Sequence, residues 1–280
     1  MPLISVLLAA HNDARYLPAA IESVLRQSLA NLELIVVDDA STDETAELVS
    51  TLHDPRLVLL TNDTQLGLAA SLNRALEAAQ GRYVARLDAD DVALPQRLER
   101  QLEAIQAGTA AVLGSAIRDL DEHGREGRLH RMPVSARAVR WHALFSSPFF
   151  HPTVLVDREA LGDLQYDPSY LESEDYDLWT RLLATGVEGA NLEAALVLKR
   201  VHQGQASLRR SDVQEAFQRQ VALREIARVA PDVDGEAAWQ VGARKGGGSR
   251  RELLRLLRAF ERRHGPSWRV RNAALRALIA

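Results

Sequence analysis

The chain has 280 residues, 46% of them hydrophobic, and a formal net charge of −4 at pH 7. This length is sufficient for one large domain with a full core and an appendage, and the absence of cysteine excludes disulfides and thiolate metal sites. No apolar run approaches the roughly 18–20 residues that span a bilayer. We therefore expect a cytoplasmic protein, either soluble or peripheral at the inner face of the membrane.

Apolar runs of strand length alternate with helical spacing through the first 90 residues. The runs predict strands at Ile4–Ala10, Leu34–Val37, Leu57–Leu60 and Tyr83–Leu87. Helices are expected at Pro18–Gln27, after a cap at Ser41 or Thr42 with Asp43 and Glu44 in the first turn, and at Leu66–Ala79 with Gly81 past its end. This order predicts an α/β fold with a largely parallel sheet covered by helices on both faces.

The elements become less regular after Pro95. We expect a helix to about Ala107, a strand at Ala111–Gly114, a loop or edge hairpin over 118–133, a helix at Ala136–Phe145, a strand at Thr153–Val156, a helix at Asp175–Thr185 and a strand at Ala194–Val201. From Asp212 the chain reads as helix, with breaks at Pro231–Gly235 and Lys245–Ser249. The sequence thus predicts an α/β body over 1–208 and a basic helical C-terminal region over 209–280.

The C-terminal region differs in charge from the rest of the chain. Residues 201–280 hold 16 basic and 8 acidic residues, and Arg251–Arg263 places leucines on one helix face and arginines on the other. A basic amphipathic helix favours an anionic partner, either a membrane surface or a polyanionic acceptor; a solvated tail is the alternative. Because aromatic residues that stack on bases are lacking, we expect no nucleic-acid partner. The oligomeric state is left open.

Acidic residues follow the predicted strands at their carboxyl ends. Asp38 and Asp39 come after the second strand, and Asp88 and Asp90 come after the fourth. In an open parallel sheet these ends form the ligand-binding edge. Carboxylates that meet there repel one another unless a cation lies among them, and oxygen ligands suit Mg²⁺ or Mn²⁺. A strand-end turn with capping acids is the structural alternative for the Asp-x-Asp pair alone.

These motifs occur together in an order that resembles glycosyltransferase family 2, a family of inverting enzymes with the GT-A fold. The matching pieces cover roughly residues 3–207: Ile4-Ser-Val-Leu-Leu-Ala-Ala-His-Asn12, Leu34-Ile-Val-Val-Asp38-Asp39-Ala-Ser-Thr-Asp43, Asn62 with Gly67-Leu-Ala-Ala-Ser-Leu-Asn73, Gly81-Arg-Tyr-Val-Ala-Arg-Leu-Asp88-Ala-Asp90-Asp91, and Glu174-Asp175-Tyr-Asp-Leu-Trp179. The resemblance implies a GT-A sheet sandwiched by helices, with a C-terminal helical appendage.

The resemblance also implies roles for individual residues. The nucleotide-binding set is Ala10, His11, Asn12, Asp38, Asp39, Gly67, Asn73 and Asp88. The Mn²⁺ or Mg²⁺ ligands are Asp88, Asp90 and His202. Asp175, with Glu174 beside it, matches the base that takes the proton of the acceptor hydroxyl; helix-dipole stabilisation is the structural alternative for this acidic pair. Two further candidates are His151, at the acceptor side or in a turn, and Arg86, paired with an aspartate or bridging the sheet to a helix.

The implied reaction is inverting transfer of a single sugar from a nucleoside-diphosphate sugar, by family analogy a UDP-sugar, to a hydroxyl acceptor. The acceptor would be a saccharide or lipid-linked saccharide in cell-surface glycan biosynthesis. No Gln-x-x-Arg-Trp sequence of processive synthases is present, and Arg74 follows Asn73, where many family members place the arginine before the asparagine. Two alternatives remain: a haloacid-dehalogenase-like phosphatase with Asp88 as nucleophile, and a non-catalytic GT-A-like binding scaffold.

Overall fold

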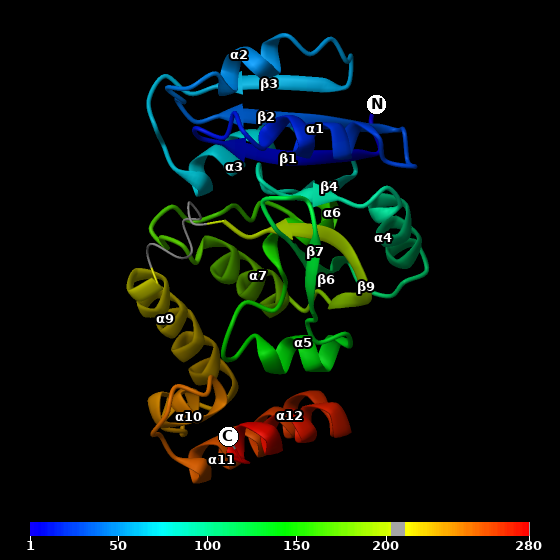
Figure 1. The fold of residues 1–280 in the computed structure, drawn as a ribbon. Helices are drawn as coiled ribbons and strands as arrows, with labels where there is room; N and C mark the ends of the chain where they lie inside the picture. Colours follow the sequence, from blue (N-terminus) through cyan, green and yellow to red (C-terminus); the bar gives the residue numbers. More distant parts are fainter. Residues whose placement is uncertain (203–210, 280) are drawn as a thin grey trace.

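The computed structural model describes residues 1–202 and 211–279. Within these residues the strands form one mixed sheet in the order β3-β2-β1-β4-β8-β6-β9-β5, with β7 paired to β6. The strands are β1 Ile4–Ala10, β2 Leu32–Asp38, β3 Leu57–Thr61, β4 Tyr83–Arg86, β5 Val92–Ala93, β6 Val112–Leu120, β7 Glu126–His130, β8 Leu155–Asp157 and β9 Gly189–Arg200. Figure 1 shows the first strands at one end of the molecule and the C-terminal helices at the other.

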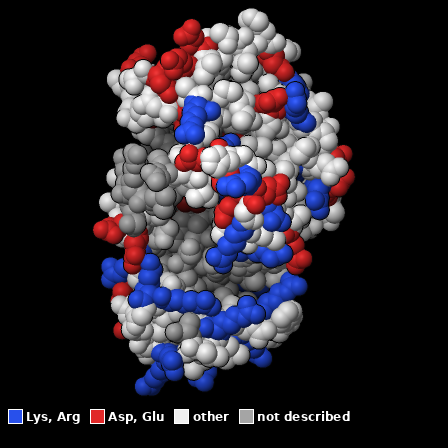
Figure 2. All heavy atoms as spheres, viewed as in Figure 1, with Lys and Arg blue, Asp and Glu red and all other residues white. Residues whose placement is uncertain are grey.

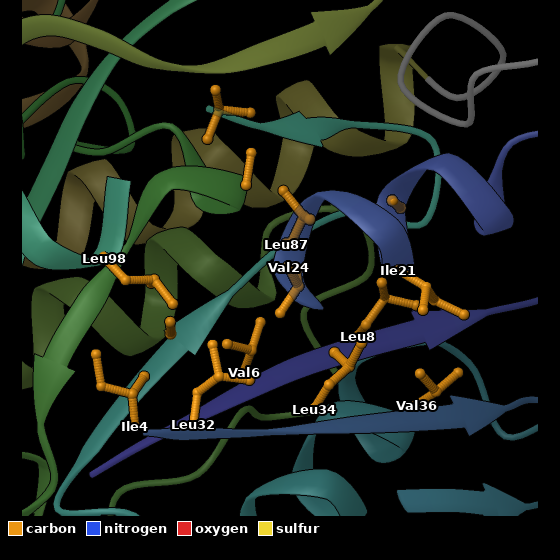
Figure 3. Close-up of a cluster of buried hydrophobic side chains, with 14 of the residues drawn as sticks. Ile4, Val6, Leu8, Ile21, Val24, Leu32, Leu34, Val36, Leu87 and Leu98 are labelled. Atoms are coloured by element: carbon orange, nitrogen blue, oxygen red, sulfur yellow. The ribbon is translucent and has the colours of Figure 1, made fainter. Parts of the chain in front are cut away.

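The four predicted N-terminal strands form a parallel half-sheet, β3-β2-β1-β4. β1 and β2 are buried on both faces because α1 (Leu17–Leu25) covers one side and α3 (Leu68–Ala78) the other. Figure 3 shows Ile21 and Val24 of α1 packed against Leu8 of β1. Leu72 of α3 lies in the opposite layer. The β-α alternation thus predicted this half correctly.

The second half of the sheet is not parallel throughout. β8 pairs antiparallel with both β4 and β6, whereas β6 and β9 run parallel. The predicted edge hairpin over 118–133 is formed by the end of β6 and by β7. β9 begins at Gly189, earlier than the predicted strand, because it pairs along the whole of β6. The sheet is therefore mixed, and the half that follows β4 departs from simple alternation.

The other helices of the body are α2 Thr45–Ser50, α4 Arg97–Gln106, α5 Ala136–His142, α6 Arg158–Leu161 and α7 Glu174–Ala184, with a 3-10 turn at His151–Thr153. The predicted cap of α2 is wrong: the helix begins at Thr45. Ser41 Oγ instead accepts a hydrogen bond from the Asn12 amide at 3.0 Å, and Asp43 accepts from the Ala14 amide at 3.2 Å. Ser41 thus holds the loop after β1, whereas Asp43 contacts both that loop and the first amide of α2, since its Oδ1 accepts from the Thr45 amide at 3.0 Å.

Gly81 also has a different role from the one predicted. α3 ends at Ala78, and its C-cap is Ala79 in an extended conformation. A Cβ atom at Gly81 would lie 2.6 Å from the Ser5 amide nitrogen. Gly81 is therefore required by the close approach of this turn to β1 and not by the end of the helix.

The C-terminal region comprises α9 Ser211–Val229, α10 Gly235–Gly242, α11 Arg250–His264 and α12 Trp268–Ile279. Its apolar residues join a cluster that includes Trp141 and Tyr176 of the body, and the Trp141 and Phe260 rings lie 5.2 Å apart. No helix in the described part of the chain has the length and apolar character needed to cross a membrane. The predicted boundary at residues 208 and 209 lies outside the described residues and stays a prediction.

Candidate active site

The carboxyl ends of β1, β2 and β3 meet at one edge of the sheet. Ala10 and Asp38 are register partners, and the Asp39 amide donates to the Ala10 carbonyl at 2.8 Å. The Asn62 amide donates to the Asp38 carbonyl at 2.9 Å. These contacts continue the backbone hydrogen bonding of the strands into the loops. The loops that hold the predicted nucleotide-binding residues are therefore anchored to the edge of the sheet.

Asp39 organises the loop that enters α3. Its buried carboxylate accepts hydrogen bonds from Asn62 Nδ2 at 2.6 Å and from the amides of Leu66 and Gly67, each at 2.8 Å. Burial raises the pKa of Asp39, but these hydrogen bonds outweigh burial and hold the pKa below its ordinary value. Gly67 has a φ of 88°, a conformation that favours glycine. Asp39 is thus an ionised anchor for this loop.

The loop after β1 lies against Asp39. His11 Nδ1 lies 2.8 Å from the Asp39 carbonyl oxygen, and Asn12 Oδ1 accepts from the Thr42 amide at 2.8 Å. Asn12 adopts a left-handed φ of 58°, which is uncommon outside glycine. Asp38 Oδ1 is buried and has no hydrogen-bond partner among the described residues. The structure therefore brings together Ala10, His11, Asn12, Asp38, Asp39 and Gly67 of the predicted nucleotide set.

Asn73 differs from the rest of that set. Its amide nitrogen donates to the Tyr166 carbonyl and its oxygen accepts from the Tyr166 amide, each at 2.8 Å. This reciprocal pair joins α3 to the segment before α7. The neighbouring Arg74 donates to the Thr61 carbonyl at 2.6 Å and also contacts Asn62. Both side chains are thus engaged within the protein, and a nucleotide contact of Asn73 stays a prediction.

Three aspartates gather beyond β4. Ligand oxygens of Asp88, Asp90 and Asp91 lie within 4.8 Å of one another. Asp91 is completely buried; one of its oxygens accepts from the Arg200 amide at 2.9 Å, and the other has no hydrogen-bond partner among the described residues. Burial, reinforced by the charge of Asp90, raises the pKa of Asp91 to about 7. A cluster of carboxylates of this kind suits a divalent cation.

His202 completes this group from the end of β9. Its Nε2 lies 3.0 Å from Asp90 Oδ2, and its ring lies 5.0 Å from that of Tyr16. The Arg200 guanidinium also lies over the Tyr16 ring, 4.4 Å from its centre. Carboxylate oxygens together with one imidazole nitrogen fit Mn²⁺ or Mg²⁺. Of the predicted ligands, Asp88 and His202 therefore each lie next to Asp90.

A buried arginine lies among these acids. Arg86 forms an ion pair with Asp88, and burial lowers the pKa of the guanidinium. The charges of both Arg86 and Lys199 lower the pKa of Asp91 and also that of Asp175. The aspartate cluster and Asp175 consequently lie within electrostatic reach of the same two cations. The expected pairing of Arg86 with an aspartate is present.

Glu174 and Asp175 occupy the first turn of α7. Asp175 is half-buried, and its Oδ2 accepts a hydrogen bond from Ser147 Oγ at 3.0 Å. Burial raises the pKa of Asp175, and the hydrogen bond from Ser147 opposes this effect. Glu174 is 7% exposed, and burial next to the charge of Asp175 raises its pKa to about 7. The two carboxyls thus differ: Asp175 reaches the surface and Glu174 does not.

His151 lies in the 3-10 turn, where its Nε2 is 2.9 Å from the Tyr166 hydroxyl oxygen. Burial lowers the pKa of His151 well below its ordinary value, so the ring is neutral. The structural turn anticipated for His151 is present.

Sequence reasoning assigned no role to Asp91, Ser147 or Lys199. Lys199 carried a detectable signal, because it is one of only two lysines in an arginine-rich chain. Asp91 was visible in the Asp-rich motif, but its burial was not. Ser147 carried no signal, because only the fold brings it to Asp175, 28 positions away.

Comparison with known proteins places this site in a family. Residues 5–167 match the family described as "Glycosyl transferase family 2". Over 204 residues the chain is 37% identical to EpsE of Bacillus subtilis (strain 168), covering 70% of this chain and 72% of the relative. It is 30% identical over 208 residues to the UDP-Glc:alpha-D-GlcNAc-diphosphoundecaprenol beta-1,3-glucosyltransferase WfaP of Escherichia coli, covering 74% and 80%.

Solved structures show the same fold. TarS 1-349 of S. aureus, in complex with UDP-GlcNAc, matches with a TM-score of 0.65 at 21% identity, covering 99% of this chain and 80% of that one. The mannosyltransferase PcManGT of Pyrobaculum calidifontis, in complex with GDP-Man and Mn²⁺, matches with a TM-score of 0.63 at 19% identity, covering 100% and 80%. The predicted GT-A fold is confirmed.

The phosphatase alternative is not supported. The Asp88 motif follows the fourth strand, and the family match spans that motif together with the loops after β1 and β2. The scaffold alternative is likewise disfavoured, because the relatives are named as enzymes. The chain is a glycosyltransferase and belongs to glycosyl transferase family 2.

Proposed function

We propose that this enzyme transfers one sugar from a UDP-sugar, with inversion, to a hydroxyl group of a lipid-linked saccharide during cell-surface polysaccharide synthesis. The supporting relative, WfaP, is named for UDP-Glc as donor and a diphosphoundecaprenol-linked sugar as acceptor. A structural neighbour of the same fold was solved with UDP-GlcNAc. Both carry UDP as the nucleotide, which is why we favour UDP over GDP.

The donor nucleotide would bind at the loops that Asp39 organises. His11, Asn12 and the buried Asp38 lie at the ends of β1 and β2. The hydrogen bond from the Gly67 amide to Asp39 fixes the neighbouring loop that enters α3. A polar group of the base can satisfy the unpaired Asp38 Oδ1. The preformed hydrogen bonds mean that little ordering is required when the nucleotide binds.

Asp88, Asp90 and His202 would hold Mn²⁺ or Mg²⁺, and the buried Asp91 lies beside them. Such a cation neutralises the charge that develops on the leaving diphosphate. The unpaired oxygen of buried Asp91 and the 3.0 Å contact between His202 and Asp90 support this assignment. The chain itself contributes Arg86, whose ion pair with Asp88 keeps that carboxylate oriented.

Asp175 would act as the general base. It is the half-buried member of the α7 acidic pair, so an acceptor hydroxyl can reach it. The raised pKa of Asp175 makes its carboxylate a stronger base, which favours proton transfer from the acceptor hydroxyl. Ser147 holds Oδ2, which leaves Oδ1 to accept the proton while the acceptor oxygen attacks the anomeric carbon opposite the leaving nucleotide.

The observation that carries this proposal is the gathering of Asp88, Asp90 and Asp91 beyond β4, within the segment that matches glycosyl transferase family 2. An oxygen-ligand cluster of this kind would hold the cation that binds the donor diphosphate, and Asp175 would supply the base. Replacing Asp175 with Asn tests the base. We expect kcat to fall about 10²- to 10⁴-fold while UDP affinity is retained. The matched control is Asp163→Asn, an exposed aspartate outside the site. Retained turnover in Asp175→Asn would refute the assignment.

A further inference from the structure

The outward face of α12 is apolar. Trp268 is 70% exposed, Leu275 51% and Ile279 81%, although this helix buries Val270 and Ala274 on its other side. The spacings of 7 and 4 residues place the three exposed side chains on one stripe, opposite the buried pair. Single exposed apolar residues are ordinary on protein surfaces, whereas a stripe that includes a tryptophan is typical of an interaction surface.

The surroundings of this stripe are strongly basic. α11 and α12 together contain nine arginines and two glutamates. Both glutamates are engaged within the pair of helices: Glu252 with Arg255, and Glu261 with Arg271 at 2.6 Å. Arg269 and Arg276 are exposed beside the apolar stripe. Figure 2 shows Lys and Arg side chains predominating at the end of the molecule formed by α10, α11 and α12.

The structure also corrects which helix carries the free apolar face. The sequence pointed to Arg251–Arg263, where leucines face one side and arginines the other. In the fold, Leu253, Leu256 and Phe260 of α11 are completely or almost completely buried in the cluster shared with the body. That face stabilises the protein and cannot enter a membrane. Only α12 presents an apolar face outward among the described C-terminal helices.

We propose that α12 docks the enzyme on the surface of an anionic phospholipid bilayer, with Trp268, Leu275 and Ile279 entering the headgroup boundary. Charge complementarity argues for this occupant: the flanking arginines pair with lipid phosphates while their apolar stems lie along the acyl boundary. Tryptophan is favoured at this depth. The inference is independent of the proposed reaction, because α12 contributes no residue to the candidate active site.

The test uses the full chain and vesicles of phosphatidylcholine containing 30% phosphatidylglycerol, with pure phosphatidylcholine vesicles as the comparison. Trp141, Trp179 and Trp239 are each at most 4% exposed, so a vesicle-induced change in tryptophan emission reports on Trp268. We expect a blue shift with the anionic vesicles that weakens as salt is raised. Trp268→Phe should keep vesicle cosedimentation and lose the blue shift.

Two variants separate the apolar and the basic contributions. Leu275→Ser with Ile279→Ser, and Arg269→Ser with Arg276→Ser, should each reduce cosedimentation with anionic vesicles by about ten-fold or more. Leu52→Ser, at a 40% exposed leucine after α2, is the matched control and should bind as the parent does. Undiminished binding of both double variants would overturn the proposal. A second result would also overturn it: the parent does not bind vesicles but forms a concentration-dependent dimer, and the Leu275/Ile279 variant does not form that dimer. The stripe would then be an interface between copies of the chain.

Discussion

His202 Nε2 lies 3.0 Å from Asp90 Oδ2, although the two residues are 112 positions apart in the chain. Asp90 lies in the turn between β4 and β5, and His202 follows β9, which pairs antiparallel with β5. The β5–β9 pairing therefore delivers the imidazole to the aspartate cluster. This contact is the structural basis for assigning His202 to the metal site.

Replacing His202 with Gln should weaken Mn²⁺-dependent UDP binding by about 10- to 100-fold, because one nitrogen ligand beside Asp90 is lost. The measurement is a calorimetric titration of UDP at fixed Mn²⁺. His123→Gln, an exposed histidine in the β6–β7 turn, provides the control. Equal affinity in His202→Gln and the parent would remove His202 from the ligand set.

Replacing Ser147 with Ala should move the acidic limb of the kcat profile toward higher pH. The hydrogen bond from Ser147 lowers the pKa of Asp175, so its removal lets burial raise that pKa further. A base must be ionised to act, and a higher pKa requires a higher pH for ionisation. Ser146→Ala, one residue earlier, should leave the profile unchanged. A profile in Ser147→Ala that overlies that of the parent would show that Asp175 does not set the acidic limb.

Replacing Glu174 with Gln should flatten the pH dependence of stability. The folded pKa of Glu174, about 7, exceeds the ordinary value of 4.5, so the folded state binds this proton more tightly than the unfolded state. The free energy of unfolding therefore falls as pH rises from about 4.5 to about 7, by on the order of 3 kcal/mol at most. Denaturant unfolding at several pH values measures the slope, with the exposed Glu193→Gln as control. An unchanged slope in Glu174→Gln would contradict the raised pKa.

Replacing Asn73 with Ala should destabilise the fold by about 1–3 kcal/mol, because two hydrogen bonds to the Tyr166 backbone are lost. The nucleotide contact predicted for Asn73 would add a loss of UDP affinity greater than about three-fold, since a hydrogen bond to the nucleotide costs more than this. Asn31→Ala, an exposed asparagine before β2, is the control for stability. Unchanged stability would contradict the structural role of these two hydrogen bonds, and unchanged UDP affinity would remove Asn73 from the predicted nucleotide set.

The sequence predicted those parts of the molecule that depend on local periodicity. Strands β1 to β4 alternate with helices, so their parallel order and the convergence of Asp38 and Asp39 at one edge followed from the pattern alone. The insertion of β8 between β4 and β6 could not be predicted, because a three-residue strand carries no period and its partners are set by tertiary packing.

The roles of individual side chains likewise depended on tertiary packing that the sequence does not show. The leucines of α11 showed which face is apolar, but not that this face packs on Trp141 of the body. Ser41 has the chemistry of a helix cap, and only the fold shows that it holds the loop after β1. Local chemistry indicates what a residue can bind, whereas its actual partner depends on distant segments.

The most direct test of the account is a calorimetric titration of UDP, with Mn²⁺ present and then chelated, on the parent, Asp90→Asn and the exposed control Asp163→Asn. The account predicts binding that requires the metal and that weakens by about ten-fold or more in Asp90→Asn, with Asp163→Asn unaffected. Folded protein that binds UDP equally well in all three forms without metal, or does not bind UDP at all, would contradict the assignment of the Asp88–Asp91 cluster as the metal and donor site.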